Sequence, residues 1–104
     1  MSFGIQPDSL TKIQKVFTAI PRIEEVVIFG SRAMGTYKNG SDVDLAIRGK
    51  GLGFTEIHNC NQALDDLLLP YAFDLCLEAN ITNEDLKAHI LRVGKVFYAK
   101  TQQI

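Results

Sequence analysis

Residues 25–47 read EVVIFGSRAMGTYKNGSDVDLAI, and this stretch decides the fold. The β-branched and aromatic run at 25–29 lacks polar alternation, which predicts a strand buried on both faces. The run stops at Gly30, and residues 31–34 are compatible with a short helical turn. The alternation of Val43, Leu45 and Ile47 then predicts a strand over 42–47 whose apolar side chains share one face.

The flanking segments add helices and strands in alternation. Upstream, apolar residues at helical spacing predict a helix that Ser9 or Asp8 caps and that Pro21 ends. The elements expected downstream are a helix over 55–69, a strand over 71–77, a helix over 82–93 with Thr82 as its N-cap, and a strand over 96–98. The order α-β-turn-β-α-β-α-β predicts an α/β fold, a small mixed β-sheet with helices packed on it.

The composition is that of an ordinary globular protein. The 104 residues predict one domain over 1–104, and 46% hydrophobic with 22% charged residues argues against disorder. With 11 basic and 12 acidic residues the net charge is −1, so no overall basic surface exists and no direct nucleic-acid binding is expected.

The cysteines and the apolar segments bear on the compartment. Cys60 and Cys76 form no C-x-x-C pair and lie in apolar patterns, which predicts buried thiols and a cytoplasmic location. No apolar stretch approaches the roughly 20 residues of a membrane span, so we expect no membrane partner. The first residues also lack the pattern of a signal peptide.

Three aspartates are the candidate catalytic and metal-binding residues. Asp42 and Asp44 lie two apart on a predicted strand and therefore point to one face. Asp74, on the next strand, is again opposite the apolar side chains, so the three carboxylates converge if the two strands are neighbours. Clustered carboxylates repel one another unless a cation is present, and Mg²⁺ prefers oxygen ligands. Two such ions would serve in-line displacement at phosphorus.

Each motif also has a plainer interpretation when it stands alone. A D-x-D is common on any surface, although aspartate is depleted in strands. The turn at Gly30 and Ser31 exposes backbone N–H groups that favour an anion, but it is equally a strand-to-helix turn with Ser31 as the N-cap. Arg32 has a surface salt bridge as its alternative role.

Taken together, Gly30 to Gly35 and, five residues later, Ser41 to Leu45 resemble the signature of the DNA polymerase β-like nucleotidyltransferases. The resemblance is closest to the minimal nucleotidyltransferases, or MNT proteins, which pair as antitoxins with HEPN-domain toxins. Asp74 falls where that family has its third carboxylate. Met34 is a departure, because many relatives have a basic residue there.

The resemblance implies a palm fold and Mg²⁺-dependent transfer of a nucleoside monophosphate, AMP from ATP, to a hydroxyl of the HEPN toxin. It implies that Asp42, Asp44 and Asp74 are catalytic and hold the metal. The residues expected to bind nucleotide are Gly30, Ser31, Arg32 and Ser41.

Two alternatives to this function stay open. One is a non-catalytic antitoxin that masks its partner, and the other is transfer to a small molecule. The chain is short for a palm domain with its own acceptor-binding domain, so we expect a protein acceptor or a homo-oligomer. Among the other polar residues, His58 and His89 are expected to be solvated or partly packed, and Arg48 and Lys50 lie in a loop that could reach phosphate.

Overall fold

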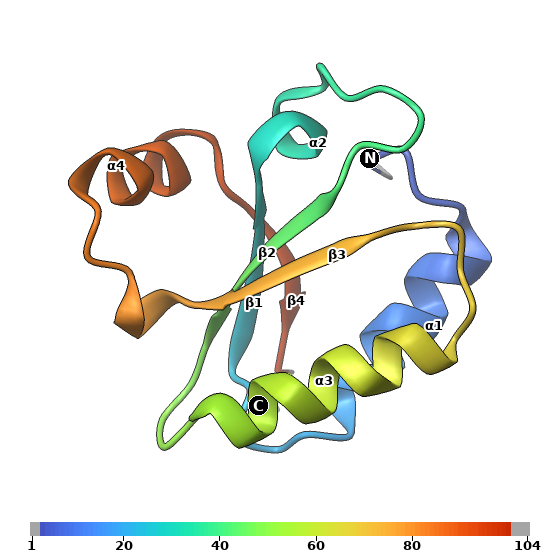
Figure 1. The fold of residues 1–104 in the computed structure, drawn as a ribbon, viewed down its shortest axis with the longest axis horizontal. Coiled ribbons are helices and arrows are strands. Elements are labelled where there is room, and N and C mark those ends of the chain that lie inside the picture. The colour runs from blue at the N-terminus through green and yellow to red at the C-terminus, as the bar shows by residue number, and fades with distance from the viewer. Residues whose placement is uncertain (1–2, 101–104) are drawn as a thin grey trace, which may run out of the picture.

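The structure is a computed structural model that describes residues 3–100. A four-stranded mixed sheet with the order β3-β2-β1-β4 lies at the centre (Figure 1). The strands are β1 (Glu25–Phe29), β2 (Val43–Arg48), β3 (Phe73–Leu77) and β4 (Lys95–Ala99). β1 is antiparallel to β2 and β4, whereas β2 and β3 are parallel, so the chain must cross over between them.

Helices cover the two faces of this sheet unequally. The helices are α1 (Pro7–Thr18), α2 (Gly30–Met34), α3 (Phe54–Asp66), the 3₁₀ turn η1 (Glu78–Asn80) and α4 (Glu84–Val93). Figure 1 shows α1 and α3 side by side at one side of the sheet, with α2 at the end of β1 and α4 apart from α1 and α3. None of the helices within residues 3–100 has the length and apolar character needed to cross a bilayer.

The burial pattern confirms that β1 is covered on both faces. Val26 and Ile28 belong to the main core beneath α1 and α3, and Val27 belongs to a smaller cluster with Ile90 of α4. Along β2, the predicted alternation is confirmed, because Val43, Leu45 and Ile47 are fully buried in the main core. The main core therefore fixes which face of β2 and β3 presents polar side chains.

Three predicted helix boundaries were wrong. α1 begins at Pro7 after Gln6, and no side chain caps it, so neither Ser9 nor Asp8 is the N-cap. Proline suits this first position because its missing N–H would have no helical partner. The N-cap of α4 is Asn83, not Thr82, because Asn83 accepts a hydrogen bond from the Leu86 N–H. α3 ends at Asp66, short of the expected residue 69.

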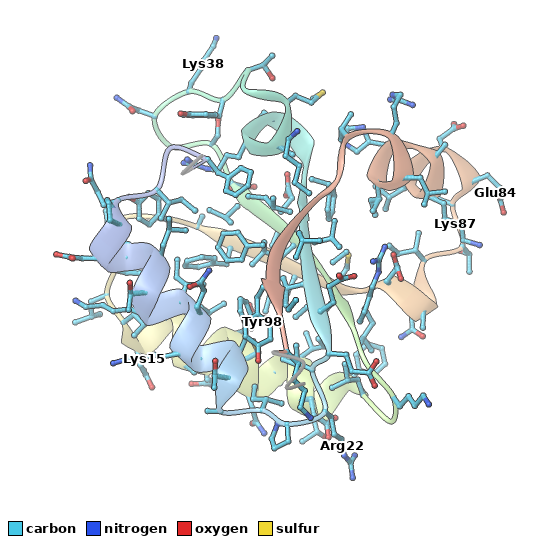
Figure 2. The ribbon with its side chains drawn as sticks, turned by 180° about the vertical axis from the view of Figure 1, so that it is seen from behind. Lys15, Arg22, Lys38, Glu84, Lys87 and Tyr98 are labelled. Carbon is cyan, nitrogen blue, oxygen red and sulfur yellow. The ribbon has the colours of Figure 1, made fainter. Side chains whose placement is uncertain are left out.

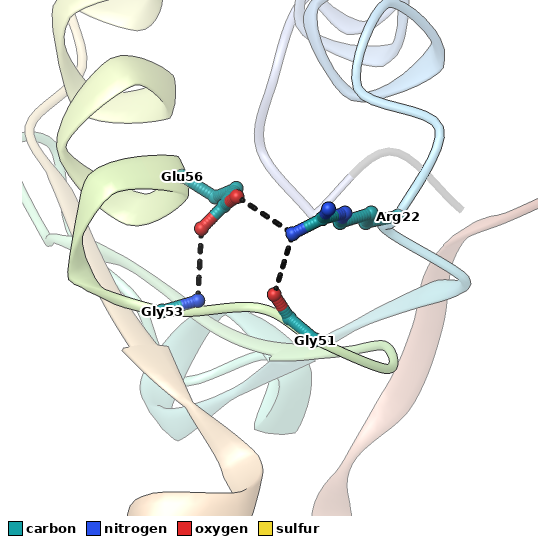
Figure 3. A network of polar contacts seen from close by, with 4 residues as sticks. All are labelled: Arg22, Gly51, Gly53 and Glu56. Carbon is teal, nitrogen blue, oxygen red and sulfur yellow. Dashed lines mark hydrogen bonds and ion pairs between the residues drawn. The ribbon is translucent and has the colours of Figure 1, made fainter.

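A polar network joins the loop after β2 to the start of α3 (Figure 3). Arg22 donates to the Gly51 carbonyl at 3.0 Å and to the Glu56 carboxylate at 3.3 Å. Glu56 also accepts from the Gly53 N–H at 2.9 Å. That backbone donor, with Arg22 contributing less, lowers the pKa of Glu56. The network therefore fixes where the crossover helix begins.

The two cysteines carry free thiols, as predicted. Cys60 is buried in the main core, and burial raises the pKa of its thiol to about 12. Cys76 is half-buried on the face of the sheet that α4 covers, and burial followed by the charges of Asp74, Asp44 and Glu78 raises its pKa to about 11. Both remain protonated thiols at neutral pH.

Candidate functional site

The parallel pairing of β2 with β3 brings two of the predicted carboxylates together. Asp44 and Asp74 are register partners, and both lie opposite the buried Val43 and Leu45 and the half-buried Phe73. Asp74 is exposed and Asp44 is half-buried. Asp42 precedes β2 and is exposed, but its charge still acts on Asp44. The fold therefore places Asp44 beside Asp74, as expected, and the convergence of all three aspartates into one site stays a prediction.

The pKa of Asp44 reflects its burial and the two carboxylates beside it. Its pKa is raised, first by burial and then by the negative charges of Asp74 and Asp42. His89 acts in the opposite direction. A carboxylate that is partly desolvated beside two others is favoured in its charged form when a cation neutralises the group. The site thus has the charge that a divalent metal would relieve.

The oxygens of these residues are not gathered into a ready-made metal cage. Within residues 3–100, no group of three or more His, Cys, Asp or Glu side chains is close enough to hold one metal ion. The donors themselves fit Mg²⁺ in kind, because they are carboxylates and Mg²⁺ commonly uses only one or two of them, with waters and substrate phosphates. Asp44 and Asp74 are the two carboxylates that the strand register places side by side.

Gly30 lies directly against the Asp44 carboxylate. A Cβ at position 30 would be 2.3 Å from Asp44 Oδ2, and the residue has φ +74, a value that L side chains rarely adopt. Gly30 opens α2 immediately after β1, and Phe29 is the register partner of Asp44. The strand ends here, the turn begins, and the carboxylate fills the space that only glycine leaves.

His89 is a residue of this site that sequence reasoning missed. It comes from α4, and its Nε2 accepts a hydrogen bond from the Gly30 N–H at 3.1 Å. Its ring also makes an edge contact with Phe29, with centroids 6.1 Å apart. A histidine at position 89 of an amphipathic helix gives no sequence signal of this contact, because the contact depends on how α4 packs over β1. The N–H that a phosphate would use is occupied by this ring.

Arg32 holds the loop between α2 and β2 in place. It is 5% exposed, and its guanidinium donates to the Ser41 carbonyl from two nitrogens and to the Phe3 carbonyl from a third. It also stacks over the rings of Tyr37 and Tyr71, at 5.1 and 5.5 Å from their centroids. Arg32 therefore has a buried structural role in place of the surface salt bridge considered as its alternative.

The remaining predicted contacts near the turn are placed as follows. Ser31 is half-buried in α2, and its carbonyl accepts from the Thr36 N–H. Ser41 is half-buried, and its hydroxyl oxygen accepts from the Lys38 N–H at 2.8 Å. Met34 is 49% exposed. The roles of Ser31, Ser41 and Arg32 in nucleotide binding stay predictions.

Arg48 is not in a loop, as the sequence suggested, but is the last residue of β2. Its guanidinium forms salt bridges to Glu25 and to Glu78, the latter at 2.7 Å. The hydrogen bond to Glu78 is the main reason that the pKa of Arg48 is raised. Arg48 thus forms ion pairs with two glutamates, and it lies at the end of β2 that is far from Asp44.

The mixed sheet, the carboxylates on parallel neighbours and the glycine beside them define a nucleotidyltransferase of the polymerase β type. The family model described as "Polymerase beta, Nucleotidyltransferase" matches residues 11–103, so the chain belongs to this family. The expected palm fold is confirmed. No curated protein matches the chain.

Solved structures agree with this assignment. One is a toxin–antitoxin complex with AMP-PNP, with 25% identity and a TM-score of 0.71 over 89% of this chain and 75% of that one. Another is an MNT antitoxin with the tri-AMPylated HEPN toxin of Shewanella oneidensis, with 21% identity and a TM-score of 0.67 over 92% and 74%. A candidate minimal nucleotidyltransferase has 24% identity and a TM-score of 0.66 over 88% and 96%.

Proposed function

We propose that this chain is an Mg²⁺-dependent nucleotidyltransferase that moves AMP from ATP to a hydroxyl of a HEPN-type partner protein, for which it is the antitoxin. The observation that carries the proposal is the register pairing of Asp44 with Asp74 on parallel strands, with Gly30 against the Asp44 carboxylate. Membership of the nucleotidyltransferase family and the fold shared with solved antitoxins support it.

In this reaction the acceptor hydroxyl oxygen attacks the α-phosphorus of ATP. A new P–O bond forms, the bond from the α-phosphorus to the bridging oxygen of the β-phosphate breaks, and pyrophosphate leaves. Metal ions bound at the site would supply charge neutralisation for the attacking and leaving oxygens. We propose that Asp42 and Asp44 hold these ions, which leaves Asp74 for the proton of the acceptor.

We propose that Asp74 is the base that accepts the proton of the attacking hydroxyl. Its carboxylate is exposed at the edge strand of the sheet, where a protein-borne hydroxyl can approach it. A base there must lie within hydrogen-bond reach of the attacking oxygen. Asp44 is half-buried beside the charges of Asp74 and Asp42, where a bound cation would relieve their repulsion, so we propose that it holds an ion instead.

The test uses a HEPN-domain partner, Mg²⁺ and ATP labelled in its α-phosphate. We expect label on the partner with the wild-type chain and none with Asp44→Asn. Asp74→Asn should reduce the rate by about 10²–10⁴-fold, the range for loss of a positioned base. Asp8→Asn, at the first turn of α1, is the matched control and should transfer at the wild-type rate. Absence of both transfer and nucleotide binding by calorimetry would contradict the proposal.

A second function, a non-catalytic antitoxin that masks its partner, is favoured by one observation. The Gly30 N–H is already bound to His89, so this donor of the turn is not free for phosphate in this conformation. The two functions differ in what Asp44→Asn does in cells that express the HEPN partner. Loss of protection supports transfer, whereas full protection by the variant supports masking.

A further inference from the structure

Leu68 is exposed to solvent and has a left-handed backbone conformation that leucine rarely adopts. It follows α3 with φ +54, and its side chain is 89% exposed. Its N–H donates to the Asp65 carbonyl at 3.1 Å, which closes the helix end in the position where glycine is usual. The monomer therefore gives Leu68 neither an unstrained backbone nor burial.

An apolar groove begins at the preceding residue. It has a volume of about 470 Å³ and runs between α1 and α3. The apolar side chains that line it are Val16, Ala19, Ile20, Ala63 and Leu67. These two helices cover the face of the sheet opposite to Asp44 and Asp74. A partner bound in this groove would leave the carboxylates accessible.

Charges of opposite sign flank the groove and the leucine. Lys12 and Lys15 lie on the α1 side, and Figure 2 labels Lys15 on that helix. Asp65 and Asp66 end α3 just before Leu68, and all four side chains are exposed. None of the four takes part in a salt bridge within residues 3–100. One surface thus carries an apolar projection, an apolar groove, and both signs of charge.

We propose that this surface, defined by Leu68, the α1–α3 groove and the four flanking charges, is a twofold interface with a second copy of the chain. A twofold interface needs a patch that is complementary to itself. Leu68 of each copy would fill the groove of the other, and the lysines of each would face the aspartates of the other. The inference is independent of the proposed transferase activity.

The first test removes the projection without harming the fold. Sedimentation equilibrium of the full chain should show a mass that rises with concentration from 11.6 kDa toward twice that value. Leu68→Gly relieves the left-handed strain, so it should unfold no lower than wild type at dilutions where both are monomers. It should raise the dimer dissociation constant by more than about tenfold, because two buried leucines are lost. Leu91 lies on α4 and is 80% exposed, so Leu91→Ala is the matched control and should leave dimerisation unchanged.

The second test exploits the charges. Lys12→Glu with Lys15→Glu should abolish the dimer, and so should Asp65→Lys with Asp66→Lys, because each variant opposes like charges across the twofold axis. Mixing the two variants should restore association as a heterodimer, since every charge then faces its opposite. A wild-type chain that stays monomeric at high micromolar concentration overturns the inference. So does a Leu68→Gly chain that dimerises like wild type, or a mixture that forms no heterodimer.

Discussion

Asp44 and Asp74 stand opposite each other in the register of two parallel strands, and this pairing makes the site. Parallel neighbours require a crossover, which α3 supplies between β2 and β3. The apolar residues that alternate with the two aspartates are drawn into the core beneath α1 and α3. Burial of the core therefore forces both carboxylates onto the other face, where they repel one another.

The raised pKa of Asp44 predicts how stability depends on pH. A group with a raised pKa in the folded state favours folding when protonated, so its contribution is lost as pH rises through that pKa. Asp44→Asn should therefore be more resistant to urea than wild type at neutral pH. The difference should shrink below the ordinary aspartate pKa of 3.8, where wild-type Asp44 is protonated in both states.

Urea unfolding at several pH values measures this difference, with Asp8→Asn as the control outside the site. Mg²⁺ should raise the unfolding temperature of wild type at neutral pH more than that of Asp44→Asn. An Asp44→Asn chain that is less stable than wild type at neutral pH would show that the crowding described here does not strain the fold.

Gly30→Ala should impair both stability and transfer. Alanine at φ +74 is strained, which costs more than about 1 kcal/mol in the free energy of unfolding. Its Cβ would also displace Asp44, which lies 2.3 Å from that position. Gly35→Ala is the matched control, because Gly35 has φ +81 but no atom lies within 4 Å of its Cβ position.

The two glycine variants should therefore lose similar stability from backbone strain, with the loss larger for Gly30→Ala. Only Gly30→Ala should lose the label-transfer activity and the response of the unfolding temperature to Mg²⁺. Equal transfer activities of the two variants would show that the contact of Gly30 with Asp44 does not matter for the reaction.

Arg32→Lys tests whether Arg32 braces the loop or binds nucleotide. Lysine keeps the charge but loses the planar fork that reaches the Ser41 and Phe3 carbonyls. We expect the free energy of unfolding to fall by at least about 2 kcal/mol, because buried hydrogen bonds to a charged group are lost. Urea unfolding measures it, with the exposed Arg92→Lys on α4 as the control. Unchanged stability with weaker ATP binding would assign Arg32 to the nucleotide instead.

The sequence predicted the elements that depend on periodicity, and missed the contacts that depend on packing between elements. The alternation in β2 and β3 placed Asp44 and Asp74 correctly, because a side-chain period of two leaves only one face free when the other is buried. For Arg32 the sequence predicts nucleotide binding, with a surface salt bridge as the alternative, and it does not show that Tyr37 and Tyr71 enclose the guanidinium. No local pattern reveals such enclosure, since Tyr71 is distant in sequence.

His89 provides the most informative prediction about the turn itself. In the structure its Nε2 accepts a hydrogen bond from the Gly30 N–H. A phosphate can therefore bind that N–H only after the ring moves away. His89→Ala removes the competitor and should strengthen ATP binding by roughly tenfold, the value of one hydrogen bond to a charged group. Calorimetry with ATP measures this, and His58→Ala on α3 is the control because its ring is exposed and its Nε2 lies 3.5 Å from the Gln62 side chain.

Loss of His89 should also lower the free energy of unfolding in the absence of nucleotide, by about 1 kcal/mol, because the Gly30 N–H loses its partner. Saturating ATP should then stabilise the variant more than wild type, since ligand binding to the native state adds stability in proportion to affinity. Weaker ATP binding by His89→Ala than by wild type would instead mean that the ring holds the turn in its binding conformation. In that case His89 would be a positioning residue that links α4 to the carboxylates rather than a competitor for phosphate.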